Sequence, residues 1–457
     1  MLGKSVHLIG VGGVGMAGLA VLLKSRGFDV SGCDVRASER THWLAKQGIR
    51  VEIGHSPRHL SGVDWVVVTP AVDRENPELR ACGDIPVRYR GEVLAEIVNG
   101  CEGIAVCGSH GKTTTSTWIA RLLRALGESV SWCIGGETGT FPVAGVALLR
   151  QSSNRTIEQS EQSNNSPLVV EADESDGTLA LYRAKTLVVT NCEYDHPDHF
   201  KTLADYVACY ETAKSQAGEV IESEALDWEL FDCSDCSIDG LRCCLESLPL
   251  HNRKNARAAV EVALRRGHRL EDIARELPSV VSELPDRRFQ VVWPNRTIEQ
   301  SEQSEQSTNP NDLLVVTDYA HHPSEIACAV GMARAKCRGV LRVLFQPHRY
   351  SRTKALLNDF PAAFADADEV LLCPVYAAFE KPIPGGDIVD LYEACRRHYA
   401  VGAVGREGVG GPLIRLCRSC EEAWTSARDS MRCGDLTLLL GAGDIIGLVP
   451  RVQNDLA

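Results

Sequence analysis

The chain of 457 residues lacks several features that mark specialised classes of protein. Aromatic residues make up only 6% of it, so its cores must consist mostly of aliphatic side chains. It has no run of 18 apolar residues, the length at which a helix begins to span a membrane. Basic residues are fewer than acidic ones, with 48 Lys and Arg and 61 Asp and Glu. The net charge of −13 argues against a general nucleic-acid binder, which would present a basic surface.

The start of the chain lacks the pattern of a secretory signal. Residues 1–5 pass directly into the strand-like segment 6–9, which is too short for the apolar region of a signal peptide. We therefore expect a cytoplasmic protein with neither a nucleic-acid partner nor a membrane partner. In that compartment the 18 cysteines are expected to be reduced. Two Cys-x-x-Cys pairs, Cys233/Cys236 and Cys417/Cys420, leave a zinc site as the alternative to structural thiols.

Short apolar runs alternate with helical patterns along the whole chain. Runs of this kind occur at residues 6–9, 65–68, 103–106, 168–170, 186–189, 313–316, 343–345, 370–372 and 436–440. Continuous apolar strands that alternate with helices are typical of parallel sheets covered on both faces. At roughly 150 residues per domain, the length suggests about three domains. We expect an α/β protein with domains at 1–98, 99–284 and 285–457.

One polar segment, residues 154–163, recurs identically at residues 295–304. The two copies lie far apart and nothing else repeats with them, which excludes a repeat architecture. Each copy is rich in Gln, Ser, Asn and Glu and cannot bury a core. We expect both copies to be disordered loop insertions between strands, because lengthening a surface loop costs little free energy.

A glycine-rich motif follows the first apolar run and precedes a helical pattern. Its glycines are Gly10, Gly12, Gly13 and Gly15. In this context the backbone can approach a phosphate group at a helix N-terminus. Asp34 ends the next strand, where an acid that binds a ribose would lie. Alone, the motif is compatible with a dinucleotide, with another nucleotide diphosphate, or with nothing more than a tight turn.

A second glycine-rich loop follows the run at 103–106. Its residues are Gly108, Ser109, His110, Gly111, Lys112, Thr113 and Thr114. The loop is not a complete Walker A motif, because Val106 stands where the first glycine would be. Its backbone N–H groups would still face phosphates, Lys112 would neutralise their charge, and Thr113 would offer a hydroxyl to Mg²⁺. The loop therefore predicts an ATP site.

Carboxylates and imidazoles follow the next two strands. Glu171 opens an acidic run directly after the run at 168–170, and His196 lies in a mixed segment after the run at 186–189. Open α/β sheets bind their ligands at the carboxyl ends of the strands. Downstream of a phosphate loop, these groups indicate a site for a hard cation rather than a solvated acidic turn.

The last third of the chain carries polar segments at residues 318–323, 348–353 and 441–444. Two arginines, Arg349 and Arg352, follow an apolar strand three residues apart. This spacing suits recognition of a carboxylate or a phosphate, although a solvated basic turn would have the same composition.

Together, these motifs resemble those of the Mur ligases, the ATP-dependent amide ligases of peptidoglycan precursor synthesis. The resemblance runs nearly end to end. It rests on segments in a fixed order at residues 10–15, 108–115, 171–176, 195–198, 318–323, 348–353 and 375–378. It implies three domains: a Rossmann-like N-terminal domain, a central parallel sheet of the P-loop ATPase type, and a Rossmann-like C-terminal domain.

The resemblance also implies a role for each motif. The UDP part of the substrate would bind to Gly10, Gly12, Gly13, Gly15 and Asp34. ATP would bind to the loop 108–114 and, on the adenine side, to His251, Asn252 and Asn255. Lys112, Glu171 and His196 would be catalytic, with Mg²⁺ on Thr113, Glu171 and His196. The incoming amino acid would lie among Tyr319, His321, Arg349 and Arg352.

The activity implied in this way is ATP-dependent ligation of L-alanine to the lactyl carboxylate of UDP-N-acetylmuramate through an acyl phosphate, by a monomer or a homodimer. One alternative is a ligase that attaches a whole tripeptide to the same UDP-sugar. Another is a regulatory ATP-binding homologue with weakened catalysis, suggested by the short segment between Asp198 and His251. A nicotinamide-dependent dehydrogenase would leave the phosphate loop and the acidic motifs without a role.

Overall fold

The computed structural model describes residues 3–136, 142, 144–145, 166–197, 199–226, 241, 244–245, 248–294, 313–378, 380–402 and 411–457. The chain divides into two compact units, Met1–Pro285 and Asp286–Ala457. Both copies of the repeated polar segment, the pair Cys233/Cys236 and Asp198 lie outside the described residues. The three domain ranges expected from the sequence remain a prediction.

The first sheet consists of five parallel strands in the order β3-β2-β1-β4-β5. Its strands are β1 (Ser5–Ile9), β2 (Asp29–Asp34), β3 (Arg50–Ile53), β4 (Trp65–Val68) and β5 (Val87–Tyr89). The connecting elements are α1 (Val14–Ser25), α2 (Glu39–Lys46), the 3₁₀ helix η1 (Pro57–Leu60), α3 (Pro77–Ala81) and α4 (Arg90–Asn99). This strand order is that of a Rossmann-type sheet, in which ligands bind where the order reverses.

The second sheet belongs to the same unit and has the order β11-β10-β6-β9-β7-β8. Its strands are β6 (Gly103–Cys107), β7 (Ser131–Cys133), β8 (Ala144–Gly145), β9 (Leu168–Glu171), β10 (Thr186–Val189) and β11 (Glu219–Glu222). Its helices are α5 (Lys112–Ala125), η2 (Thr178–Leu181), α6 (Leu203–Gln216), α8 (Leu250–Arg265) and α9 (Leu270–Val281). The strand pairs are parallel, except that β8 runs antiparallel to β7.

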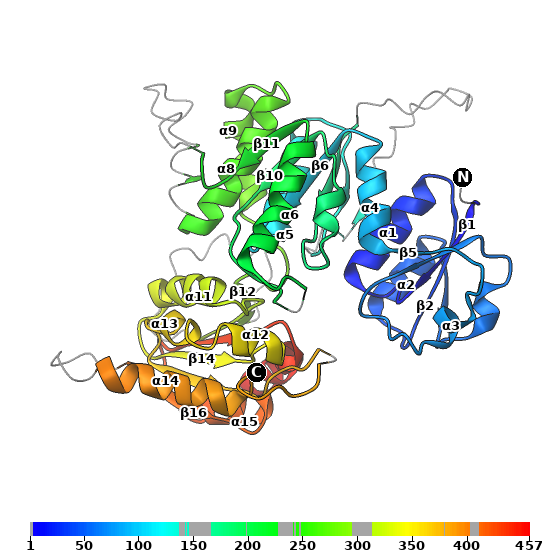
Figure 1. Ribbon diagram of the computed structural model, residues 1–457. Helices are drawn as coiled ribbons and strands as arrows, with labels where there is room; N and C mark the ends of the chain where they lie inside the picture. The colour runs from blue at the N-terminus through cyan, green and yellow to red at the C-terminus, as the bar shows by residue number, and fades with distance from the viewer. Residues whose placement is uncertain are drawn as a thin grey trace. The chain divides into compact units, whose positions relative to one another are not determined.

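Both faces of the second sheet are covered, as its continuous apolar strands predict. Ile104 and Val106 of β6 join the cluster that α5, α8 and α9 form on one face (Figure 1). Ala105 and Cys107, which alternate with them, join the cluster on the opposite face. The alternation follows from the period of two in a β-strand.

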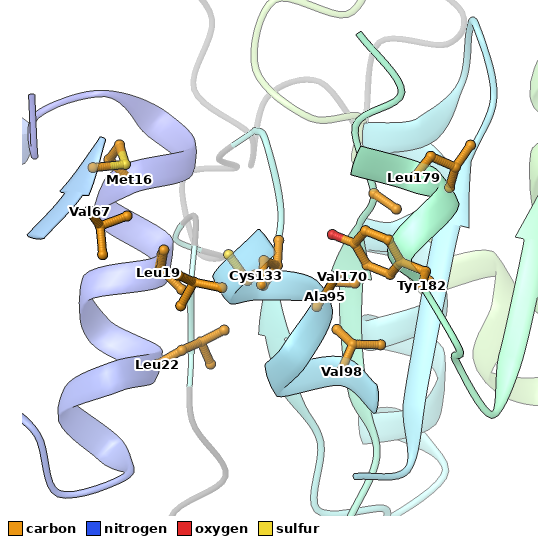
Figure 2. Packing of buried hydrophobic residues seen from close by; sticks show 14 of the residues in the cluster. Met16, Leu19, Leu22, Val67, Ala95, Val98, Cys133, Val170, Leu179 and Tyr182 are labelled. Carbon is orange, nitrogen blue, oxygen red and sulfur yellow. The ribbon is translucent and has the colours of Figure 1, made fainter. Parts of the chain in front are cut away.

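The cluster on that opposite face also includes residues of the first sheet and of its helix α1. Leu19 and Leu22 of α1 point toward the side on which Cys133 and Ala95 lie (Figure 2). Gly18 in the same helix allows this close approach, because a Cβ there would lie 2.6 Å from the Sγ of Cys133. One continuous aliphatic core therefore joins the two sheets of this unit.

The second unit contains a sheet in the order β12-β13-β17-β14-β15-β16. Its strands are β12 (Gln290–Trp293), β13 (Leu314–Asp318), β14 (Leu341–Phe345), β15 (Glu369–Leu372), β16 (Leu413–Leu416) and β17 (Leu436–Leu440). Only β12, at the edge, pairs antiparallel with its neighbour among these described strands. The helices are α11 (Pro323–Lys336), α12 (Tyr350–Ala355), α13 (Phe360–Ala363), α14 (Ile388–Gly402), α15 (Cys420–Arg428), η4 (Asp444–Leu448) and α16 (Val449–Leu456).

The described structure confirms the α/β fold with sheets that are mostly parallel. Cys417 and Cys420 are buried free thiols that pack with Cys373 and Trp424 in a hydrophobic cluster. Among the described helices, none has both the length and the apolar character that a membrane crossing requires.

A buried arginine holds the centre of the second unit's sheet together. Arg342 of β14 is 5% exposed, and it donates to Oδ2 of Asp435 at 2.6 Å and to Oε2 of Glu369 at 3.1 Å. The pKa of Asp435 is lowered, because hydrogen bonds from Arg342 and from backbone N–H groups outweigh the effect of burial. Removing the guanidinium would leave the buried carboxylate of Asp435 without a counter-charge, whereas Glu369 would keep its ion pair with Arg415 at 2.9 Å.

We predict that Arg342→Met lowers the free energy of unfolding by about 3–5 kcal/mol. The matched control is Arg397→Met, because Arg397 pairs with Glu393 at 3.8 Å and both side chains are exposed. The control should change stability by less than about 1 kcal/mol. Urea unfolding followed by circular dichroism measures both values. Equal, small losses in the two variants would contradict this account of the buried network.

Candidate active site

The carboxyl ends of β6, β9 and β10 carry the polar groups that the sequence motifs predict for the central region. The loop after β6 is the phosphate-loop candidate, Glu171 ends β9, and the segment with His196 follows β10. These three strands are neighbours in the sheet, with β6 between the other two. Parallel strands end at the same edge, so their loops converge there.

Two glycines give the loop after β6 a shape that other residues would not allow. Gly108 has φ +133° and Gly111 has φ +80°, which L-residues rarely adopt. A Cβ on Gly108 would lie 2.0 Å from Oγ1 of Thr190, and a Cβ on Gly111 would lie 2.6 Å from Oδ1 of Asn255. The loop therefore needs glycine both for its backbone angles and for the contacts that its neighbours make.

Side chains from the segment after β10 hold this loop in place. The amide of Asn191 accepts from the backbone N–H of His110 at 3.0 Å and donates to its carbonyl at 3.0 Å. Thr190 donates to the same carbonyl at 2.5 Å. A contact from helix α6 adds to these hydrogen bonds, because the hydroxyl groups of Ser109 and Tyr206 lie 2.9 Å apart. The loop is thus held in one shape by side chains as well as by its own backbone.

Lys112, the first residue of α5, lies over the loop and contacts a buried acid. Its Nζ donates to Oε1 of Glu174 at 2.8 Å and to the carbonyl of Gly108 at 2.6 Å. Burial lowers the pKa of Lys112, but Glu174 and the neighbouring carboxylates raise it more, so its pKa lies above the usual value. The ammonium group is therefore charged at neutral pH and available to phosphate oxygens.

Glu171 and Thr113 meet beside this lysine. The Thr113 hydroxyl lies 3.0 and 3.1 Å from the two carboxylate oxygens of Glu171. The N–H of Gly135 donates to Oε2 of Glu171 at 2.7 Å and fixes the orientation of the carboxylate. This pair presents hydroxyl and carboxylate oxygens at the first turn of α5, which is the donor chemistry that Mg²⁺ prefers.

His196 reaches the same group from the segment after β10. Its Nε2 lies 3.5 Å from Oε1 of Glu174 and 3.6 Å from Oδ2 of Asp195. Its backbone is left-handed, with φ +57°, an uncommon conformation for histidine that positions the ring at this edge. Lys112 and His196 therefore meet at one acid, Glu174, and Glu171 joins them through Thr113, the residue after Lys112 in α5.

Glu174 belongs to an acidic motif of the sequence, but its role did not follow from the sequence. Its side chain is fully buried, and its Oε2 has no hydrogen-bond partner among the described residues. Lys112 and His196 both contact Oε1, and the orphaned Oε2 of the same carboxylate fits a site that takes up a cation. No sequence signal distinguishes it from Asp173, whose carboxylate instead pairs with Arg90 at 3.0 Å. Burial raises the pKa of Asp173, and Arg90 and Lys112 lower it to about 2.

The predicted adenine-side residues lie at the start of α8. Asn252 and Asn255 are buried one turn apart, and the Asn255 amide lies 3.4 Å from Oδ1 of Asn252. Asn255 also lies against Gly111, which brings the two predicted ATP motifs together in space. His251 occupies the first turn of the same helix and is partly exposed.

The first glycine motif folds into a tight turn between β1 and α1. The N–H groups of Gly10 and Val11 both donate to the carbonyl of Cys33 at 2.9 Å. Asp34, expected to face a ribose, accepts from the N–H of Gly12 at 2.9 Å and so holds the turn itself. Gly12 leaves the room for this contact, since a Cβ there would lie 2.7 Å from the carboxylate. Gly13 precedes α1 as its N-cap, and Gly15 lies in its first turn.

The second unit brings its own predicted residues together at the carboxyl ends of β13 and β14. The rings of Tyr319 and His321 lie 5.3 Å apart, and those of His321 and His348 lie 5.5 Å apart. Arg352 is 5% exposed and lies 3.2 Å from Nδ1 of His348. Arg349 has a left-handed backbone, with φ +70°, at the start of α12.

Two side chains of this second group, His348 and Tyr376, were not assigned a role from the sequence. His348 joins the Tyr319–His321 pair to Arg352, and its ring stacks on Tyr376 at 5.5 Å. Both residues lie in the motif segments 348–353 and 375–378, but which residues of these segments face the site depends on the turn after each strand. Arg287 lies over the Tyr319 ring at 4.7 Å and donates to the carbonyl of Gly441 at 2.9 Å.

Three family models match the chain in order. The model described as Mur ligase family, catalytic domain, matches residues 5–101, and that of the Mur ligase middle domain matches residues 106–216. The model described as Mur ligase, glutamate ligase domain, matches residues 304–443.

Curated relatives match over almost the full length. A protein of Gloeobacter violaceus named UDP-N-acetylmuramate–L-alanine ligase is 33% identical, over 98% of this chain and 95% of its own. A protein of the same name from Solibacter usitatus is 35% identical, over 97% of this chain and 93% of its own. Among solved structures, UDP-N-acetylmuramate-alanine ligase of Thermotoga maritima is similar with a TM-score of 0.71 at 22% identity, over 99% of both chains. A murein peptide ligase of Psychrobacter arcticus is similar with a TM-score of 0.60 at 21% identity, over 99% of this chain and 98% of its own.

We predict that removing the charge of Lys112 weakens ATP binding roughly 10–150-fold, the equivalent of about 1.5–3 kcal/mol for a hydrogen bond to a charged group. The variant to use is Lys112→Met combined with Glu174→Gln, because the lysine substitution alone would leave Glu174 buried without a counter-charge. Isothermal titration calorimetry with ATP measures the affinity.

The control for this experiment is Lys214→Met, whose lysine pairs with Glu211 and Glu222 and not with a residue of the loop 108–114. It should bind ATP as the unaltered protein does. Unchanged affinity in the double variant would refute the assignment of this loop to phosphate binding.

Proposed function

The chain belongs to the Mur ligase family, and from this membership we propose that it joins L-alanine to the lactyl carboxylate of UDP-N-acetylmuramate with conversion of ATP to ADP and phosphate. The observation that carries the proposal is the convergence of Lys112, Glu171 and His196 beside a phosphate loop, at the edge of the central sheet. The names of curated relatives that match over nearly the whole chain support the choice of substrates.

The chemistry explains why ATP is needed. A carboxylate does not react with an amine at neutral pH, because the hydroxide-like oxygen that would have to depart is too poor a leaving group. Transfer of the γ-phosphoryl group from ATP to the lactyl carboxylate forms an acyl phosphate and releases ADP. The amino group of L-alanine then attacks the acyl carbon, the amide bond forms, and the C–O bond to phosphate breaks. The amine gives up its proton, and inorganic phosphate leaves.

The residues of the phosphate loop stabilise the first transfer. Lys112 is charged and lies at the N-terminus of α5, whose free N–H groups also favour anions. Its ammonium group would neutralise the negative charge that spreads over the transferred phosphoryl oxygens. Because Asn191 and Thr190 hold the loop rigid, little reorganisation is needed when ATP binds.

The donor set beside Lys112 fits Mg²⁺. Thr113 and Glu171 offer a hydroxyl and a carboxylate, and His196 adds an imidazole 3.5 Å from Oε1 of Glu174, whose other oxygen is orphaned. These residues would hold the cation, which when bound screens the charges of the phosphate groups and lets two anions approach each other. Glu171 is already oriented for this role by the N–H of Gly135.

The remaining motifs complete the proposal. The turn at Gly10–Gly15 would bind the diphosphate of the UDP-sugar at the N-terminus of α1, while Asp34 holds the turn in shape. In the second unit, Arg349 and Arg352 would bind the carboxylate of the amino acid next to Tyr319 and His321. Because substrates of this kind occur inside the cell, the proposed enzyme acts in the cytoplasm. We propose that it is a monomer or a homodimer.

The Glu171 carboxylate gives a direct test of the cation site. Glu171→Gln keeps the shape and the contact with Gly135 but removes the charge. We expect the Mg²⁺ concentration for half-maximal ligation to rise at least about tenfold, because the variant loses about 1.5 kcal/mol of interaction with a charged group. The KM for the UDP-sugar should stay unchanged. Glu219→Gln, at the opposite end of the same sheet, is the control and should leave the Mg²⁺ titration unaltered.

The identity of the amino acid is tested by competition between L-alanine and L-alanyl-γ-D-glutamyl-meso-diaminopimelate in one ATP-dependent assay. We expect the higher kcat/KM for L-alanine. Glycine and L-serine should react roughly 10–200-fold less efficiently, because one methyl group is worth only about 1–3 kcal/mol of discrimination. A higher kcat/KM for the tripeptide would make the chain a recycling ligase, although the mechanism of activation would be the same.

A further inference from the structure

A second group of metal-ligating side chains lies in the N-terminal sheet, away from the phosphate loop. It consists of His7 on β1, Cys33 on β2, His59 in η1 and Glu78 in the first turn of α3. His7 and Cys33 share one face of the sheet, because His7 pairs with Ser31 and Ile9 pairs with Cys33 in the parallel register. The two strands are covered on this face by η1 and α3.

Glu78 lies at the centre of the group. Its Oε2 is 2.8 Å from Sγ of Cys33 and 3.4 Å from Nε2 of His7, and its Oε1 is 2.5 Å from Nδ1 of His59. One ligand atom from each of the four residues lies within 4.8 Å of all the others. The side chains of His7 and Glu78 are 1% and 0% exposed, and Cys33 is buried as well.

The hydrogen bonds of this group do not account for all of its atoms. Nδ1 of His7 lies 2.9 Å from the hydroxyl of Ser31, a contact that directs Nε2 into the centre of the group. That Nε2 is buried and makes no hydrogen bond within the described part of the chain. A buried imidazole nitrogen that is aimed at a thiol and a carboxylate, with its other nitrogen held by a hydroxyl, has the arrangement of a metal ligand with an outer-shell partner.

From this geometry we propose that His7, Cys33, His59 and Glu78 bind one Zn²⁺ ion, as a structural site separate from the site of ligation. Zinc takes nitrogen, sulfur and carboxylate oxygen ligands in a tetrahedron, whereas Mg²⁺ and Ca²⁺ select oxygen. Four protein ligands close the coordination sphere, which is typical of structural zinc.

The charges of the proposed site balance. One thiolate and one carboxylate neutralise the two charges of the ion, and the two imidazoles bind as neutral ligands. The proton of the Cys33 thiol passes to solvent as the Zn–S bond forms, so binding weakens as the pH falls. A neutral centre avoids the large free-energy penalty of a buried net charge.

The ion would hold together β1, β2, η1 and α3, four elements that are separate in sequence, beside the glycine turn. The carbonyl of Cys33 accepts the N–H groups of Gly10 and Val11, so the residue that would bind zinc through its sulfur also anchors the turn. Bound zinc would thus tie η1 and α3 to the two central strands and stabilise the turn from the side opposite to α1.

The test uses the full-length protein, purified from zinc-supplemented cells and dialysed, with metal content measured by mass spectrometry. We expect about one zinc ion per chain in the unaltered protein and at least a fivefold lower content in Cys33→Ser and in His59→Gln. His59→Gln is included because His59 is partly exposed, at 17%, so its replacement disturbs packing less. The control is Cys82→Ser, which removes another buried thiol close to Glu78 but not one of the four ligands, and should keep its zinc.

Replacement of zinc by Co²⁺ provides a second readout. The unaltered protein and Cys82→Ser should show thiolate-to-cobalt charge-transfer absorption together with the intense visible bands of tetrahedral Co²⁺, and Cys33→Ser should lose the charge-transfer band. A chelator should lower the Tm of the unaltered protein and leave that of Cys33→Ser unchanged. The absence of stoichiometric zinc and of the cobalt spectrum in the unaltered protein, or their retention in Cys33→Ser and His59→Gln, would overturn the proposal.

Discussion

The contact between Lys112 and Glu174 is the interaction on which the central site depends. It places a positive charge over the phosphate loop before any phosphate is present, and the buried carboxylate keeps that charge in place. A buried ion pair of this kind costs desolvation on both sides, which is repaid only when the remaining polar atoms find partners. Lys112 also donates to the carbonyl of Gly108, whereas one oxygen of Glu174 has no partner among the described residues. The lysine therefore has its partners, whereas one oxygen of the acid remains open to a further donor or a cation.

The loop around this pair is rigid for reasons that lie outside the loop. Gly108 and Gly111 permit its backbone angles, but Asn191 and Thr190, which follow a different strand, select one shape among those that glycine allows. Rigidity of this kind lowers the cost of reorganisation when charge develops during transfer. The same principle applies to the first glycine motif, in which Asp34 and the carbonyl of Cys33 hold the turn.

The two faces of the N-terminal sheet serve different purposes. The face covered by α1 is aliphatic, and Leu19 and Leu22 of α1 extend the same core toward the central sheet (Figure 2). The opposite face carries His7 and Cys33 among apolar neighbours, with Glu78 brought in by α3. Burying polar groups among apolar side chains costs free energy unless these groups bind one another or a ligand.

Local sequence determined the type of those elements that carry an apolar run or a glycine motif, and the order of the motifs. Apolar runs fixed the strands of parallel sheets, since a strand buried on both faces must be apolar throughout, and the glycine patterns fixed the two turns that precede α1 and α5. These features depend on residues that are close together in the chain. What the sequence by itself left undecided is which acid would face Lys112, because Asp173 and Glu174 are adjacent and chemically alike. The strand order of the sheet and the turn after β9 decided that Asp173 meets Arg90 and Glu174 meets Lys112. The same holds for His7, Cys33, His59 and Glu78, which no spacing in the chain relates to one another. Only the parallel register of β1 with β2, and the packing of η1 and α3 against them, brings these four side chains within reach of a single ion.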